Sequence, residues 1–223
     1  KHGIMCDENG LLQTDGVIIH IAEDEYLTNW LKPYLQFCFE THADQYDAVG
    51  EDLSGKMFLY QIAGPTSLQI LEKASGTNLH DINFIWSKNV TIAGHDVLVL
   101  RLGMAGTLAY EVHGNVEGSL DVYNAIWEAG KGYGMKKLGQ IAYMNNHTED
   151  GFPQANYHFP YPWFENAGFA QWAKKYPGIG WINDNPHCWG SMGPDIKLRY
   201  RNPVELGWGR MINFDHDFVG KKA

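Results

Sequence analysis

Residues 57–76 read MFLYQIAGPTSLQILEKASG and predict a strand followed by a helix. The apolar run at 57–64 is typical of a buried strand, and a Gly-Pro pair follows its last residues. Thr66, with Gln69 three residues later, predicts a capping box at the start of the helix. Gly76 is typical of a helix C-terminus, because glycine adopts the left-handed backbone conformation without strain.

The residues that follow continue this mixed pattern. A turn at 93–95 separates two apolar runs and predicts a hairpin. Periodicity predicts further strands at 82–86 (INFIW), 97–102 (VLVLRL) and 109–113 (AYEVH), and a helix at 118–129. The order strand, helix, strands, helix predicts an α+β fold class with a split βαβ, ferredoxin-like domain over 55–140.

The flanks of this domain differ in character. Residues 1–28 are typical of β structure with a turn at Asn9 and Gly10, and 30–42 predict a helix. Residues 155–189 hold ten aromatic side chains and four prolines, too many prolines for one helix or a central strand. We expect this segment to form an Ω-like lid packed by its own rings.

Composition excludes several classes of function. A net charge of −9 without a basic stripe argues against nucleic-acid binding, since phosphate contacts need clustered Lys and Arg. No apolar run approaches the ~20 residues of a membrane span, so no membrane association is expected. The cysteines Cys6, Cys38 and Cys188 form no CxxC pair, which favours a reducing, cytoplasmic compartment.

Two weaker candidate sites have simple explanations. Glu149 and Asp150, beside an aromatic segment, suggest a carbohydrate enzyme, but a polar turn before Gly151 explains them. A metal site is not expected, because the spacing matches no ligand pattern in the possible set His147, His158, His187 and Cys188.

Gln61, Glu111 and Tyr143 are the stronger candidates, although each also has a purely structural interpretation. Gln61 can be a polar residue at a strand end, and Glu111 an outward-facing strand residue. Tyr143 can be a core ring whose hydroxyl is satisfied. Periodicity alone leaves these alternatives open.

Four motifs occur in order along nearly the whole chain. The QIAGP stretch ends the strand at 57–65, and RLGMAGTLAYEV spans 101–112. DENG with GVIIH opens the chain, and PVELGWG with DFVGKKA closes it. They resemble, in turn, the QGP, RTGYTGEDGFEI, NENGGIIDDLIVY and PLEAGLGW…DFIGREA motifs of the glycine-cleavage T-protein family. The resemblance implies a T-protein-like, folate-binding fold with tetrahydrofolate as cofactor.

Departures from the family pattern narrow this resemblance. The family's DD pair aligns with Thr14 and Asp15, and its GARDSLRLEAG motif aligns with 139–146, which lack the Arg and Asp. The aromatic insertion after Gln154 has no T-protein counterpart. With these changes the chain resembles the tetrahydrofolate-dependent aromatic O-demethylases, which act on vanillate- or syringate-type methoxybenzoates.

The resemblance also implies roles for individual residues. Tyr143 would be the catalytic acid that protonates the departing aryl oxygen. Gln61, Glu111 and Tyr110 would bind the pterin, and His20 is a candidate for binding the carboxylate of the aromatic substrate. A carboxylate suits a pterin because it accepts from a ring N–H and the exocyclic amine together.

Other activities within the family remain as alternatives: an aminomethyltransferase, a demethylase of a sulfonium compound, or a non-catalytic folate-binding protein. The missing Arg and Asp argue against the first. The aromatic segment fits the second less directly, although a cation can lie on Trp faces.

The resemblance further implies family segments before Lys1 and a C-terminal β domain, so we expect a fragment whose missing domains belong to a longer chain. Residues 1–54 would form the first part of a folate-binding domain, and 55–140 the ferredoxin-like second domain. Residues 141–223 would return to the first domain, with the aromatic-rich insertion at 155–199.

Overall fold

The computed structural model describes residues 1–223 apart from 105, 156, 177–190 and 192. These residues divide into two compact units, one formed by 1–50 with 153–223 and the other by 51–152. Both units combine helices with strands, which confirms the α+β fold class.

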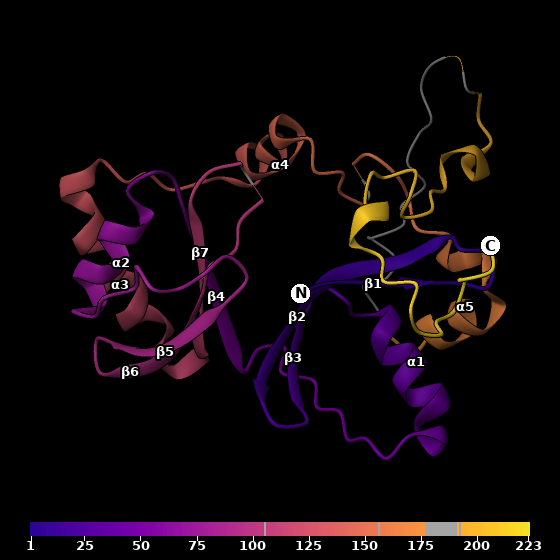
Figure 1. Ribbon diagram of the computed structural model, residues 1–223, viewed down its shortest axis with the longest axis horizontal. Helices are drawn as coiled ribbons and strands as arrows, with labels where there is room; N and C mark the ends of the chain where they lie inside the picture. Colours follow the sequence, from indigo (N-terminus) through magenta and orange to yellow (C-terminus); the bar gives the residue numbers. More distant parts are fainter. Residues whose placement is uncertain (105, 156, 177–190, 192) are drawn as a thin grey trace. The chain divides into compact units, whose positions relative to one another are not determined.

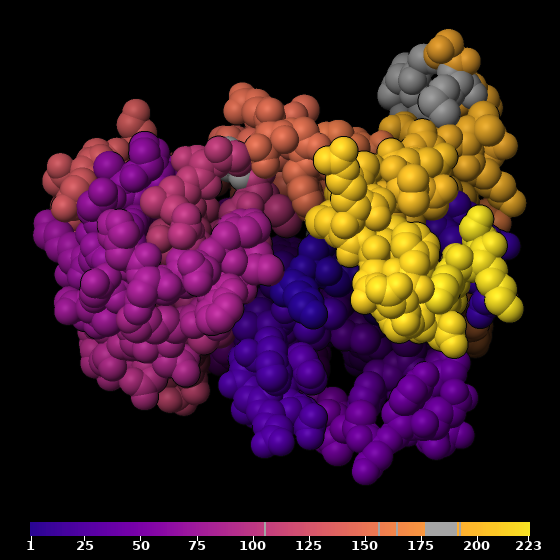
Figure 2. Space-filling model, in the orientation of Figure 1, coloured from indigo at the N-terminus to yellow at the C-terminus, as the bar shows by residue number. Residues whose placement is uncertain are grey.

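The first unit contains an antiparallel sheet with the strand order β1 (His2–Cys6), β2 (Leu12–Ala22) and β3 (Glu25–Asn29). The turn expected at Asn9 and Gly10 joins β1 to β2, and Gly10 has a φ of +72°. C-terminal residues pack on this turn, as Figures 1 and 2 show. The Leu12 N–H donates to the Arg201 carbonyl at 2.9 Å.

Aromatic rings form the core of the first unit. They come from α1 (Tyr34–His42), which begins after Pro33 rather than at residue 30, and from the segment that includes α5 (Ala167–Ala173). Consecutive ring contacts, with centroids 5.0–5.8 Å apart, join the buried side chains Tyr161, Trp163, Phe169, Trp172 and Phe37.

This core corrects the expected lid. Trp163, Phe169 and Trp172 do pack on one another, but Phe169 and Trp172 also pack against α1. The Trp163 indole N–H donates to the Gln13 carbonyl. Trp163, Phe169 and Trp172 are at most 5% exposed, so these rings belong to the core of the unit and not to an exposed cover. Trp181 and Trp189, which were part of the same expectation, lie outside the described residues.

The second unit contains an antiparallel sheet with the strand order β4 (Met57–Ala63), β7 (Ala109–Asn115), β6 (His95–Leu100) and β5 (Ser87–Ile92). The helices α2 (Ser67–Ser75) and α3 (Ser119–Gly130) cover one face of this sheet (Figure 1). The core between helices and sheet is apolar and includes Leu71, Ile92, Val99, Val112 and Val122.

The connection from α2 to β5 differs from the expectation. A split βαβ unit needs a parallel strand pair, whereas every pair in this sheet is antiparallel. Residues 82–86, expected as a strand, instead form an irregular return that includes Ile85 at a φ of +63°. This return carries the chain back across the helix-covered face, so β5 starts at the end of the sheet where β4 stops.

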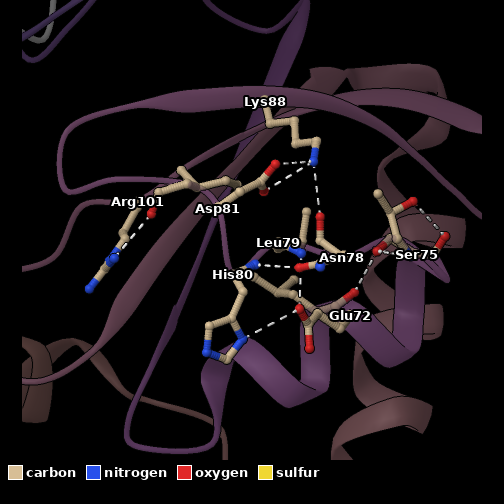
Figure 3. A network of polar contacts seen from close by, with 11 residues as sticks. Glu72, Ser75, Asn78, Leu79, His80, Asp81, Lys88 and Arg101 are labelled. Atoms are coloured by element: carbon tan, nitrogen blue, oxygen red, sulfur yellow. Dashed lines mark hydrogen bonds and ion pairs between the residues drawn. The ribbon is translucent and has the colours of Figure 1, made fainter.

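Polar contacts hold this connection in place (Figure 3). Glu72 on α2 accepts from the Leu79 N–H at 2.9 Å, and Lys88 on β5 donates to Asp81 at 2.9 Å. Arg101 donates to the Ile82 carbonyl at 3.0 Å. Because the charged side chains of this connection are hydrogen-bonded within it, we interpret their role as holding the connection and not as binding a ligand.

The ends of the helices match the sequence in part. Gly76 ends α2 in the left-handed conformation, as expected. The capping box at Thr66 does not form, since the Thr66 side chain makes no cap hydrogen bond. A further helix, α4 (Gln140–Asp150), was not predicted and ends at Gly151, whose φ is +72°.

Candidate functional site

Alternation along β7 divides its side chains between the two faces of the sheet. Tyr110 and Val112 point toward the helices, so Glu111 and His113 occupy the opposite face. In the register of β4 with β7, Gln61 lies directly opposite Glu111. Side chains that are directly opposite share a face, so Gln61 and Glu111 are neighbours on the face opposite α2 and α3.

Glu111 is bound to His113 by a buried hydrogen bond. The Nε2 atom of His113 lies 3.0 Å from Oε2 of Glu111, and the two side chains are 2% and 10% exposed. When the Glu111 carboxylate is ionised it can only accept, and in that state Nε2 of the His113 imidazole is the donor of this bond. His113 therefore leaves the carboxylate with further lone pairs.

Tyr143 lies on α4, within range of the negative charge of Glu111. Its side chain is partly buried, and its pKa is raised above the usual value, first by burial and then by the negative charge of Glu111. The phenol therefore keeps its proton at neutral pH. His147, one turn later, is 3% exposed. Its ring lies edge-on to the Tyr143 ring, with the two centroids 4.5 Å apart.

The end of α4 approaches the start of β7 through the Asp150 side chain, which reaches the loop before β7 (Figure 1). A Cβ atom added at Gly106, in the loop that precedes β7, would lie 2.2 Å from Oδ1 of Asp150 at the end of α4. Gly106 also has a φ of +60°, so both space and backbone conformation favour glycine. The loop and the helix can pack this closely because residue 106 has no side chain.

Two further predicted site residues do not share the sheet face of Glu111 within the second unit. Tyr110 is 1% exposed and packs in the apolar core, on the opposite face of the sheet from Glu111. Its position favours a structural role over pterin contact. His20 belongs to the first unit, where its exposed ring stacks on Tyr26 with centroids 4.9 Å apart. Its role in binding a substrate carboxylate stays a prediction.

Sequence reasoning did not single out His113, and it considered His147 only as a possible metal ligand. The pattern Glu-Val-His places His113 two residues after Glu111, and thus on the same face of any strand. The pattern Tyr143 to His147 has helical i, i+4 spacing, and the His147 Nδ1 lies 2.9 Å from the Tyr143 carbonyl oxygen. Each spacing points to its histidine only when residues 109–113 are taken as a strand and residues 140–150 as a helix.

Other possible sites receive little support. In the part of the chain that the structure describes, no group of three or more His, Cys, Asp or Glu side chains could hold a metal ion. No helix among the described residues is long and apolar enough to cross a membrane. A shallow hollow on the helix-covered side of the second unit is lined by residues of the network in Figure 3, including Glu72, Asn78 and His80.

Comparison with known proteins identifies related sequences. The sequence-family model of the GCVT N-terminal domain matches residues 1–158 of the chain. A sesamin methylene transferase from Sinomonas sp. strain No.22 is 44% identical over 223 residues, which are 100% of this chain and 49% of that protein. A syringate O-demethylase from Sphingobium sp. strain SYK-6 is 28% identical, covering 100% of this chain and 50% of that protein.

An aminomethyltransferase matches over a similar share of its length. An aminomethyltransferase from Caldanaerobacter subterraneus subsp. tengcongensis is 32% identical, covering 98% of this chain and 50% of that protein. The chain thus spans about half the length of the curated relatives it matches.

Proposed function

Because the chain belongs to the family of the GCVT N-terminal domain, we propose that it is part of an enzyme that transfers a one-carbon unit from an aryl ether to tetrahydrofolate. In the specific form we favour, the enzyme is an O-demethylase that takes the methyl group of a vanillate- or syringate-type methoxybenzoate. The observation that carries the proposal is the grouping of a carboxylate, an amide and a phenol at Glu111, Gln61 and Tyr143.

The donor set at this site suits a reduced pterin. The pterin ring N–H and exocyclic amine form a planar pair of donors, and the Glu111 carboxylate can accept from both. The Gln61 amide, on the same face of the sheet, can both donate and accept beside it. Tetrahydrofolate would supply N5, which takes the carbon and releases a proton in place of the one that Tyr143 gives.

Tyr143 would act as general acid. An aryl ether resists cleavage because a phenolate is a poor leaving group. As the carbon–oxygen bond breaks, its electron pair goes to the aryl oxygen, and the Tyr143 hydroxyl donates its proton there. Such help is worth about 10²–10⁴-fold in rate. The raised pKa keeps this proton in place until the substrate arrives.

The 44% identity to a sesamin methylene transferase favours a second candidate, in which the ether is a methylenedioxy bridge. The same residues would serve, but two carbon–oxygen bonds break in turn, so both aryl oxygens leave and each needs a proton. Tyr143 would donate to one of them, and N5 and N10 of the folate would release two protons as they take the methylene carbon. The two candidates differ in the oxidation state of the transferred carbon, which is a methyl group from a methoxyarene and a methylene group from a methylenedioxyarene.

The product of the reaction tests both candidates. We expect the full-length protein, incubated with tetrahydrofolate, to release a phenol from vanillate, syringate or sesamin. Mass spectrometry of the folate then separates 5-methyl from 5,10-methylene product. A protein that binds folate and releases no phenol from any aryl ether would contradict the reaction. Release of methyl groups from a sulfonium donor, or of aminomethyl groups, would instead support the alternative activities.

A further inference from the structure

We propose that His113 is a positioning residue that fixes the orientation of the Glu111 carboxylate toward the folate pterin. This inference rests on the proposed function of Glu111 as the pterin-binding carboxylate. The Nε2–H of His113 would hold Oε2 of Glu111, so that the plane of the carboxylate is set before the ligand arrives.

The position of His113 in the sheet argues for this role. In register, His113 lies between Leu59 on β4 and Leu98 on β6, so its neighbours on both sides are apolar. Burying a polar ring in such a row costs free energy unless the ring is hydrogen-bonded. An apolar side chain would suit the sheet better, so the imidazole is best explained by the bond that it makes to Glu111.

The chemistry of glutamate explains why the bond matters. A free glutamate side chain rotates about three bonds and loses that freedom when a ligand binds. The His113 bond, 3.0 Å long and nearly excluded from solvent, removes part of that loss in advance. Since each carboxylate oxygen has two lone pairs, the His113 bond does not block the two donors of the pterin.

Direct folate titration of the full-length protein tests the proposal. We expect His113→Leu, which keeps the apolar bulk, to raise the Kd for tetrahydrofolate about tenfold, the size of a lost hydrogen bond to a charged group. The KM for the folate should rise by a similar factor, while kcat at saturating folate stays close to the wild-type value. That split separates positioning from catalysis.

Conservative variants test the N–H donor itself. His113→Gln can reach Glu111 with an amide N–H and should restore most of the affinity, whereas the shorter His113→Asn should not. His95→Leu is the matched control: it removes an imidazole–carboxylate contact of 3.1 Å, to Asp121, from another strand of the sheet. We expect it to leave the Kd unchanged.

Three outcomes would count against the proposal. Equal affinity of the Leu and wild-type proteins, or equal loss in the Gln and Asn variants, would show that the N–H donor does not position Glu111 and would leave the proposed function intact. Absence of folate binding by the wild-type protein would refute the proposed function, and this inference with it.

Discussion

Asp15 in the first unit and Glu111 in the second are both carboxylates on sheet strands, but protein groups engage them differently. Oδ1 of Asp15 accepts from the Tyr161 hydroxyl at 2.6 Å, and Oδ2 lies 2.9 Å from Nε2 of His2. Within the described residues, the contact shown at Glu111 is the one from His113 to Oε2. A carboxylate whose two oxygens are engaged stabilises the fold, whereas one with oxygen to spare can bind a ligand.

The tyrosines beside these carboxylates show the same difference. Burial, followed by the nearby carboxylate charge, raises the pKa of both Tyr161 and Tyr143. The Tyr161 proton is used in the bond to Asp15, and its ring is 7% exposed in the core. Tyr143 is only partly buried, on a helix that was not part of the predicted core. Proximity to a carboxylate alone therefore does not mark a site.

The largest effect should come from Tyr143→Phe, because it removes the proposed proton donor and leaves the ring in place. We expect turnover to fall by about 10²–10⁴-fold and the Kd for folate to stay within about threefold. Release of the phenol in single-turnover experiments measures the first quantity, and calorimetric titration measures the second. Unchanged turnover would mean that Tyr143 is a structural ring and would favour a non-catalytic, folate-binding protein.

Glu111→Gln should have the next largest effect, on binding rather than on chemistry. The amide accepts less strongly than the carboxylate and presents an N–H where the pterin also donates. We expect the Kd for tetrahydrofolate to rise about 10–100-fold, the range for hydrogen bonds to a charged group. Asp15→Asn is the matched change in the first unit and should lower stability instead. Loss of stability in Glu111→Gln together with loss of folate affinity in Asp15→Asn would contradict the assignment of Asp15 to the fold and Glu111 to ligand binding.

Tyr161→Phe should destabilise the first unit without changing the chemistry. It removes a 2.6 Å hydrogen bond to the Asp15 carboxylate and leaves that oxygen without its donor. We expect the free energy of unfolding to fall by about 1–3 kcal/mol, measured by urea denaturation. Per folded molecule, phenol release should match the wild-type value, and a loss there would place Tyr161 in the reaction.

The smallest effect is the dependence of stability on alkaline pH. The pKa of Tyr161 is raised in the folded state, whereas in the unfolded chain it is near 10. Below about pH 10 both states keep the proton, and the contribution to stability is complete. As the pH rises further, the unfolded state alone loses its proton, so stability falls by up to about 1.4 kcal/mol per pH unit.

Comparison of the wild-type protein with Tyr161→Phe isolates the contribution of Tyr161 to the pH dependence of stability. In Tyr161→Phe the slope between about pH 10 and 11 should be shallower than in the wild-type protein. Tyr34 and Tyr200, whose pKa values are raised to about 12, are present in both proteins and cancel in the difference. Parallel slopes would mean that folding does not raise the pKa of Tyr161.

Sequence reasoning placed the strands that carry Gln61 and Glu111, because alternating apolar residues and a Gly-Pro turn are local signals. It could not show that these two residues face each other, since strand register depends on contacts far apart in the chain. The run INFIW at 82–86 has the composition of a strand but forms an irregular return, because tertiary contacts override local propensity.

The aromatic segment teaches a similar lesson. Its composition indicated packed rings, which the structure contains, but not which partner the rings would meet. Phe37 and Tyr34 on α1 are more than a hundred residues away in sequence and contact Phe169 directly. The proposed roles of Gln61, Glu111 and Tyr143 came from a family resemblance and remain predictions.

The pairing of β4 with β7 limits which kinds of sequence change the second unit can tolerate. Deleting one residue within β4, before Gln61, would turn every later side chain in that strand to the other face. Ile62 would then lie opposite Glu111, and the Gln61 amide would enter the apolar core between the sheet and the helices α2 and α3. Variation of this strand should therefore proceed by replacing residues at constant length, with insertions and deletions confined to the loops.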